Sequence, residues 1–191
     1  MDRFESYIEG RFKNGDGYYN WTRPLKYLLF EYEQHLAGNR DSKIIWNEFV
    51  KNKRDHSVSI EHIYPQNPGS GWPDWSVDYS DDQIKRLTNS LGNLLALETR
   101  INSSLQNVSY EDKLNGNGRP GNGYRNGSHS EVDVANNYSE WTPESIKSRG
   151  INMIDFMLEH WELGSIDESR KLRLLGLSFI KEIKESTATE D

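Results

Sequence analysis

The chain of 191 residues contains no cysteine. It can therefore form neither a disulfide framework nor a thiolate zinc site, and we expect no zinc cofactor. It also lacks any apolar run near the ~18 residues that a membrane-spanning helix needs. The polar N-terminal residues show no signal-peptide pattern. These absences exclude a disulfide-rich secreted scaffold and an integral membrane protein. They favour a cytoplasmic protein with no membrane partner.

Apolar and basic residues are both in short supply. Hydrophobic residues make up 34% of the chain, although six tryptophans and ten tyrosines partly offset this because each buries a large area. The net charge of −7 is unusual for a DNA-binding protein, but it is unevenly distributed: residues 1–57 carry +1, residues 58–130 carry −2 and residues 131–191 carry −6. The acidity therefore lies away from the middle of the chain. Within residues 100–130 the balance turns positive, with four basic residues against two acidic ones. Such a modest patch implies weak, salt-sensitive affinity for DNA unless another domain or subunit contributes.

Periodic apolar positions predict a chain that is mostly helical. Helices are expected over residues 22–38, 44–50, 81–90, 98–107, 142–161 and 167–186, and short strands over 58–63 and 92–97. Thr22 and Thr142 are suitable N-caps, each with a proline in the first turn, and Gly38 is a suitable helix stop. We expect the last helix to close the core, and the alternative is that it binds a partner helix.

The residues that could carry chemistry gather around the two predicted strands. Glu61 and His62 end the first strand, ahead of the turn that Pro65 imposes. Asn93 lies at the start of the second strand, and Asn102 lies on the helix that follows. Hydrolysis of a phosphodiester with a divalent metal needs a base, one or two oxygen ligands and a group that orients the base. The pattern supplies each of these groups and is typical of a nuclease.

Three elements carry a resemblance to a known family: residues 61–66 (Glu-His-Ile-Tyr-Pro-Gln), residues 91–94 (Leu-Gly-Asn-Leu) and Asn102. Together they resemble the His-Asn-Asn signature of HNH (ββα-metal) endonucleases. The closer resemblance is to the HNH domain at the C-terminal end of GmrSD-type, modification-dependent restriction enzymes of bacteria, over roughly residues 18–163. The resemblance continues into residues 21–36, Lys113 and residues 141–149.

The resemblance implies a role for each motif residue. His62 would be the general base that deprotonates water for in-line attack on phosphorus, and Asn93 would hold its imidazole in the productive direction. Glu61 and Asn102 would ligate one Mg²⁺ or Mn²⁺ ion, with Glu61 standing where the family usually has Asp. Each residue also has an ordinary structural interpretation, as a strand-end residue, a turn asparagine or a solvent-facing helix asparagine. Asn107 is the fallback ligand.

Basic residues after the motif are candidates for contacts with DNA phosphates. Lys113 is either a surface charge or a group that neutralises the scissile phosphate. The Gly/Asn-rich stretch 115–130 cannot pack a core. It is either a disordered surface excursion or an arm on which Arg119, Tyr124 and Arg125 clasp the DNA backbone.

The predicted architecture is mostly α with a small embedded ββα-metal motif, in one compact domain. It comprises a helical scaffold (1–57), the HNH core (58–113), the Gly/Asn-rich loop (114–130) and a C-terminal helical layer (131–191). The predicted function is metal-dependent hydrolysis of DNA, in restriction of phage DNA with or without modified bases. A nucleotide-using restriction domain or subunit is the expected partner. Two alternatives stay open: a non-catalytic DNA-binding or partner-binding module, and a metal-independent structural domain whose last helix docks a protein.

Overall fold

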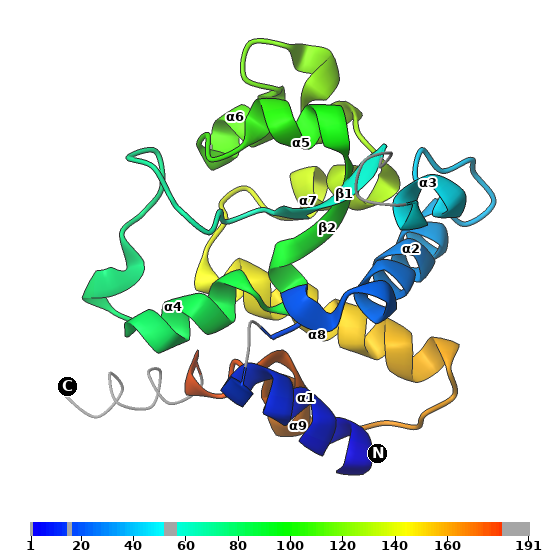
Figure 1. The fold of residues 1–191 in the computed structure, drawn as a ribbon, viewed down its shortest axis with the longest axis vertical. Coiled ribbons are helices and arrows are strands. Elements are labelled where there is room, and N and C mark those ends of the chain that lie inside the picture. Colours follow the sequence, from blue (N-terminus) through cyan, green and yellow to red (C-terminus); the bar gives the residue numbers. More distant parts are fainter. Residues whose placement is uncertain (1, 15–16, 52–56, 181–191) are drawn as a thin grey trace. The chain divides into compact units, whose positions relative to one another are not determined.

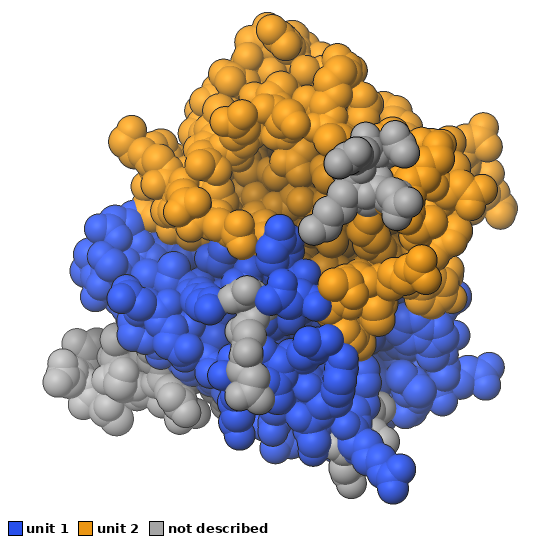
Figure 2. Space-filling model, viewed as in Figure 1, with its two compact units in different colours: residues 1–20, 74–93, 142–191 blue, residues 21–73, 94–141 orange. Residues whose placement is uncertain are grey.

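The computed structural model describes residues 2–14, 17–51 and 57–180. The chain forms two compact units, and each unit combines segments that are distant in the sequence (Figure 2). Unit 1 consists of residues 1–20, 74–93 and 142–191, and unit 2 of residues 21–73 and 94–141. The boundary after residue 93 falls inside the motif. Asn93 therefore belongs to unit 1, and the other predicted site residues belong to unit 2.

Unit 2 contains the sheet. Its helices and strands are α2 (Arg23–Ala37), α3 (Trp46–Val50), β1 (Val58–His62), β2 (Leu94–Glu98), α5 (Thr99–Leu105), α6 (Tyr110–Asn115) and α7 (His129–Asn137). The two strands pair antiparallel, and α5 follows β2 directly (Figure 1). The rest of the regular structure in the described residues is helical. The predicted fold, mostly α with a small ββα motif, is confirmed.

The register of the sheet places the motif. Glu61 pairs with Leu95 and His62 with Leu94, so His62 is the last paired residue of β1. Residues 94–97 are buried on both faces of β2, against which α2 and α7 also pack. A strand that is covered on both faces has a continuous apolar sequence rather than an alternating one, and this explains the Leu-Leu-Ala-Leu run.

The sequence of α2 shows why the predicted helices form. Leu25, Leu28, Leu29 and Tyr32 are buried along one stripe, as the 3.6-residue period requires. Gly38 ends the helix at a φ of 60°, a conformation that costs glycine little. Thr22 is the N-cap residue, but its side chain makes no capping hydrogen bond.

Unit 1 is helical throughout its described elements. They are α1 (Asp2–Asn14), the 3-10 turns η2 (Trp75–Val77) and η3 (Leu91–Asn93), and the helices α4 (Asp81–Thr88), α8 (Pro143–His160) and α9 (Glu168–Leu175). The N-terminus of α8 is capped as predicted, because the Thr142 side chain accepts a hydrogen bond from the backbone N–H of Ser145. Helix α1 is not among the predicted elements. No helix in the described ranges is long and apolar enough to cross a bilayer.

The last predicted helix is wrong in its extent. It was expected over 167–186, but α9 ends at Leu175, where Gly176 adopts a φ of 73° and caps the helix in the left-handed conformation. Leu172 and Leu175 are buried in unit 1. Residues 181–186 lie outside the described residues. The apolar stripe predicted for one continuous helix therefore ends with α9, after Leu172 and Leu175.

The Gly/Asn-rich stretch is also different from its prediction. Residues 115–130 form two short 3-10 turns, η4 (Pro120–Asn122) and η5 (Tyr124–Asn126), followed by the first residues of α7. Tyr124 is 0% exposed, so the stretch does contribute to a core. Glycine makes this packing possible, because a Cβ on Gly123 would lie 2.4 Å from the carbonyl oxygen of Leu114. The expectation that this composition cannot pack was wrong for this reason.

Candidate functional site

The end of β1 presents Glu61 and His62 in opposite directions. Successive residues of an extended strand project to opposite faces, and both residues have extended neighbours in the β1–β2 ladder. Both are largely buried: Glu61 is 4% exposed and His62 is 8% exposed. In a regular strand, the side chains of these two neighbouring residues would lie on opposite faces.

The carboxylate of Glu61 is the centre of a buried network. Lys113, on α6, donates from Nζ to Glu61 Oε1 at 2.5 Å and to the carbonyl oxygen of His62 at 2.9 Å. Tyr124, on η5, donates its hydroxyl to the same Oε1 at 3.1 Å. The ammonium group of Lys113 also lies 5.7 Å from the centroid of the Trp72 ring, within range of a cation–π interaction. Side chains from two separate segments of unit 2, α6 and η5, thus converge on one carboxylate of β1.

Burial dominates the electrostatics of this network. It raises the pKa of Glu61, and the charge of Lys113 and the hydrogen bonds from Lys113, Tyr124 and the His62 backbone oppose that rise. Burial likewise lowers the pKa of Lys113, opposed by the charge of Glu61. The pKa of Tyr124 is raised well above its usual range, first by burial and then by the charge of Glu61. Each charge is thus costly to bury alone, and the pair is tolerated because both partners are present.

Asn102 joins α5 to β1. Its Nδ2 donates to the Ser59 hydroxyl at 3.0 Å and to the Ile60 carbonyl oxygen at 3.2 Å. The amide is therefore fixed by its nitrogen, and no residue in the described ranges donates a hydrogen bond to its Oδ1. An amide oxygen held in this way has the chemistry of a ligand for a hard cation such as Mg²⁺.

The predicted metal ligands, Glu61 and Asn102, do not both fit a metal ion in their present positions. One oxygen of the Glu61 carboxylate, Oε1, already accepts from an ammonium and a hydroxyl, and the ammonium charge would repel a dication bound at either oxygen. Within the described residues, no group of three or more His, Cys, Asp or Glu side chains is arranged to hold a metal. Asn102 fits the role by its chemistry, and Glu61 does not in this arrangement. The fallback residue Asn107 is exposed, and its backbone oxygen accepts from the Trp72 indole at 3.3 Å.

Asn93 has surroundings of its own in unit 1. It is fully buried at the end of η3, and its Nδ2 donates to the carbonyl oxygen of Thr88 at 2.8 Å. The preceding residue, Gly92, accepts a hydrogen bond from Arg149 on α8 at 2.7 Å. The predicted role of Asn93 in orienting His62 stays a prediction.

The predicted phosphate contacts divide into buried and exposed residues. Lys113 is 0% exposed and paired with Glu61, not at the surface. Tyr124 is also buried, so the expectation that it clasps DNA from a flexible arm was wrong. Arg119 and Arg125 are exposed, and Arg125 donates from Nε to the Asn115 side chain at 3.3 Å. Sequence reasoning missed the Lys113–Glu61–Tyr124 network, because no local pattern relates residues that are 52 and 63 positions apart.

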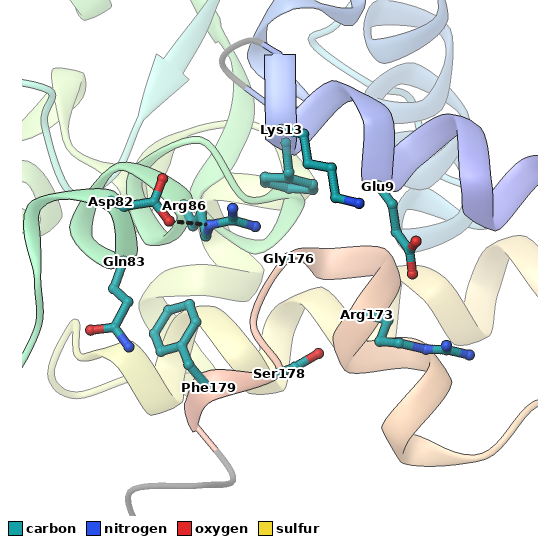
Figure 3. Close-up of a pocket in the computed structure, with 10 residues that line it drawn as sticks. Glu9, Lys13, Asp82, Gln83, Arg86, Arg173, Gly176, Ser178 and Phe179 are labelled. Atoms are coloured by element: carbon teal, nitrogen blue, oxygen red, sulfur yellow. Dashed lines mark hydrogen bonds and ion pairs between the residues drawn. The ribbon is translucent and has the colours of Figure 1, made fainter.

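Unit 1 contains a separate open hollow of about 480 Å³ (Figure 3). It is lined by residues of α1, α4, α9 and the segment after α9: Glu9, Phe12, Lys13, Asp82, Gln83, Arg86, Arg173, Gly176, Ser178 and Phe179. Arg86 is paired with Asp82 at 2.7 Å and lies 6.0 Å from the centroid of the Phe12 ring. The lining mixes charges of both signs, and it contains none of the residues predicted for the nuclease site.

A comparison with protein families finds one match. The family model described as "GmrSD restriction endonucleases, C-terminal domain" matches residues 3–156 of the chain. Neither the comparison with curated proteins nor the comparison with solved structures finds a significant match. The matched range contains both motif segments, Lys113, the Gly/Asn-rich stretch and most of α8.

Proposed function

The chain belongs to the family of C-terminal domains of GmrSD restriction endonucleases, and on that premise we propose that it is a nuclease domain that hydrolyses phosphodiester bonds in DNA, with His62 as the general base. The observation that carries the proposal is the placement of His62 at the last paired position of β1, in a chain that matches this family over most of its length.

The surroundings of His62 support a role as a base. The sheet pairing with Leu94 and the hydrogen bond from Lys113 to the His62 carbonyl oxygen fix the backbone on which the imidazole is carried. The residue keeps 8% of its surface accessible, in contrast to Lys113 and Tyr124, which keep none. A positioned imidazole accepts the proton of a water molecule while the water oxygen bonds to phosphorus and the 3′-oxygen leaves.

A divalent cation is part of this proposal. When bound, a Mg²⁺ or Mn²⁺ ion supplies a Lewis acid that stabilises charge on the phosphate oxygens. Of the two predicted ligands, Asn102 has the oxygen better prepared to hold such an ion, because its amide nitrogen is already fixed on β1. Glu61 would contribute a second ligand only after releasing Lys113.

The remaining parts of the proposal concern substrate and context. Arg119 and Arg125 are exposed in unit 2 and have the charge to contact the DNA backbone. A role in restriction follows from membership of the family. We propose phage DNA, with or without modified bases, as the substrate, a nucleotide-using domain or subunit as the partner, and a cytoplasmic location.

Nicking of a supercoiled plasmid in Mg²⁺ or Mn²⁺ tests the proposal. The wild type should convert the plasmid to the open circular form, and His62→Ala should lose this activity while keeping its circular dichroism spectrum. His35→Ala is the matched control, because His35 is an exposed histidine of α2 in the same unit. Equal nicking by the wild type and His62→Ala, or no nicking by the wild type in either metal, would contradict the proposal.

One observation favours a second candidate function, a non-catalytic module that binds DNA or a partner. The Glu61 carboxylate is neutralised by Lys113 and closed off from solvent, as expected of a site that no longer uses it for chemistry. If this alternative holds, the wild type should bind duplex DNA with the same affinity in EDTA and in Mg²⁺, and no product should form.

A further inference from the structure

We infer that Glu61, Lys113 and Tyr124 form a positioning network for the His62 end of β1, and that Glu61 acts through Lys113 and not as a metal ligand. This inference rests on the proposed function, because positioning His62 matters for catalysis only if His62 is the base. The network itself is a structural arrangement that can be tested without activity.

Lys113 is the branch point of the network. One hydrogen bond from its Nζ goes to Glu61 Oε1 and the other goes to the carbonyl oxygen of His62. That carbonyl belongs to the peptide between His62 and Ile63, beyond which the β1–β2 pairing does not continue. A buried side chain therefore fixes the peptide plane at the point where the ladder no longer does so.

Glu61 determines where the Lys113 ammonium lies. The two groups are 0% and 5% exposed as side chains, so water does not compete for either one. Tyr124 donates to the same oxygen and restricts the carboxylate from a third direction. Without Glu61, the ammonium would be a buried charge with a single carbonyl partner in the network, and it would be drawn towards solvent and away from the His62 carbonyl.

The same contacts argue against metal ligation by Glu61. A dication at Glu61 Oε1 would have to displace Lys113, which is also held by the His62 carbonyl oxygen and by the Trp72 ring, and a dication at the other oxygen would lie beside the ammonium charge.

Nuclear magnetic resonance provides a test that does not depend on activity. The probes are the backbone amide signal of Ile63, which belongs to the peptide that Lys113 binds, and the ring signals of His62. The inference predicts that both probes shift in Glu61→Gln and in Lys113→Met. It predicts that they stay shifted in the double variant Glu61→Met/Lys113→Met, which leaves no charge buried but still lacks the hydrogen bond from Lys113 to the His62 carbonyl oxygen. Wild-type signals in both single variants would overturn the inference.

Tyr124→Phe covers the case in which a charge-removing variant fails to fold. This change removes a single hydroxyl from the network and should shift the His62 ring signals in the same direction by a smaller amount. Unmoved signals in Tyr124→Phe, together with wild-type signals in the double variant, would show that the network has no influence on His62 and would overturn the inference.

Binding of Mn²⁺, followed by calorimetry without DNA, tests the second half of the inference. Glu61→Gln should leave the Kd for Mn²⁺ within about twofold of wild type, whereas Asn102→Ala should raise it at least tenfold. A tenfold rise in Glu61→Gln would show that Glu61 is a ligand and would overturn the inference. Absence of nicking by the wild type would count against the proposed function alone, because the signals of His62 and Ile63 decide the network independently.

Discussion

Each unit of the molecule contains a fully buried cation that binds one segment of the motif. In unit 2, Lys113 donates to the carbonyl oxygen of His62, and in unit 1, Arg149 donates to the carbonyl oxygen of Gly92. The partners differ: Lys113 has a carboxylate at 2.5 Å, whereas the motif contact of Arg149 is a backbone oxygen. The comparison indicates that both motif segments depend on long side chains from outside the motif to fix their backbone.

The largest effect on stability is expected from removing one member of the buried Glu61–Lys113 pair. Lys113→Met leaves the Glu61 carboxylate buried without its cation and should lower the free energy of unfolding by about 3–5 kcal/mol. The double variant Glu61→Met/Lys113→Met buries no charge and should lose much less. Urea denaturation measures both. If the loss of stability in the double variant equals the sum of the losses in Lys113→Met and Glu61→Met, the two side chains are not coupled.

Glu131 differs from Glu61, since it is a buried acid that forms no ion pair with any cation in the described part of the chain. It is 3% exposed, and its Oε1 accepts no hydrogen bond from the described residues. Burial, with a smaller contribution from the charge of Glu33, raises its pKa to about 7, although the hydrogen bonds from Ser128 and the charge of Lys43 oppose the rise. A buried acid of this kind binds its proton more tightly in the folded protein than in the unfolded chain.

The pH dependence of stability follows from this raised pKa. The stabilisation by protonated Glu131 should be fully present below pH 4.5 and lost as the pH rises through about 7. At ~1.4 kcal/mol per pH unit, the loss between these values is about 3 kcal/mol. Chemical denaturation between pH 5 and pH 8 measures it. Glu131→Gln should remove this part of the pH dependence, and an unchanged pH profile in that variant would contradict the assignment.

Gly92→Ala tests how closely the motif segment of unit 1 packs on α8. A Cβ on Gly92 would lie 2.0 Å from the Ile146 carbonyl oxygen and 2.8 Å from the Gly150 nitrogen, both backbone atoms of α8 that cannot rotate away. We expect a loss of about 1–3 kcal/mol in the free energy of unfolding. Gly10→Ala is the control in the same unit, because a Cβ there would meet no atom within 4 Å. Equal stability of Gly92→Ala and wild type would contradict the close packing of η3 on α8.

The smallest stability effect is expected for exposed cations. Arg119→Ala and Arg125→Ala should each change the free energy of unfolding by less than about 0.5 kcal/mol. If each arginine contacts one phosphate, the slope of log K for DNA against log salt should fall by about 0.9 in each variant. Arg23→Ala, at an exposed arginine of α2, is the control for general loss of charge. An unchanged slope in both variants would remove these residues from the DNA contacts.

The helices that could be predicted are those with local signals. Residues 22–38 and 142–161 carry caps, prolines and a regular apolar stripe, and the structure has α2 and α8 there. Helix α7 was missed although residues 128–131 (Ser-His-Ser-Glu) have the pattern of a capping box, in which the Ser128 backbone N–H donates to the Glu131 side chain at 2.8 Å. A long-range contact also holds this N-terminus. Glu33, on α2, accepts hydrogen bonds from the backbone N–H groups of His129 and Ser130 at 2.9 and 2.7 Å. No pattern within 115–137 reveals a carboxylate contributed from about a hundred residues earlier.

The candidate site shows the same division between local and long-range information. The positions of Glu61 and His62 at the end of a strand follow from the short apolar run and the proline after it, and β1 confirms that placement. The pairing of Glu61 with Lys113 depends on how α6 and η5 fold back onto β1. The sequence therefore identifies residues with the right chemistry, but it does not show which of them a buried partner has already engaged.

Chemical rescue is the most direct measurement of the central claim, that His62 is the base of a nuclease. His62→Ala leaves space where the imidazole was, and the plasmid-nicking rate of this variant can be followed as free imidazole is added in Mg²⁺. The account predicts that nicking rises with imidazole concentration in His62→Ala and not in the wild type. A wild type that nicks DNA, together with a His62→Ala variant that nicks equally well without imidazole, would contradict it.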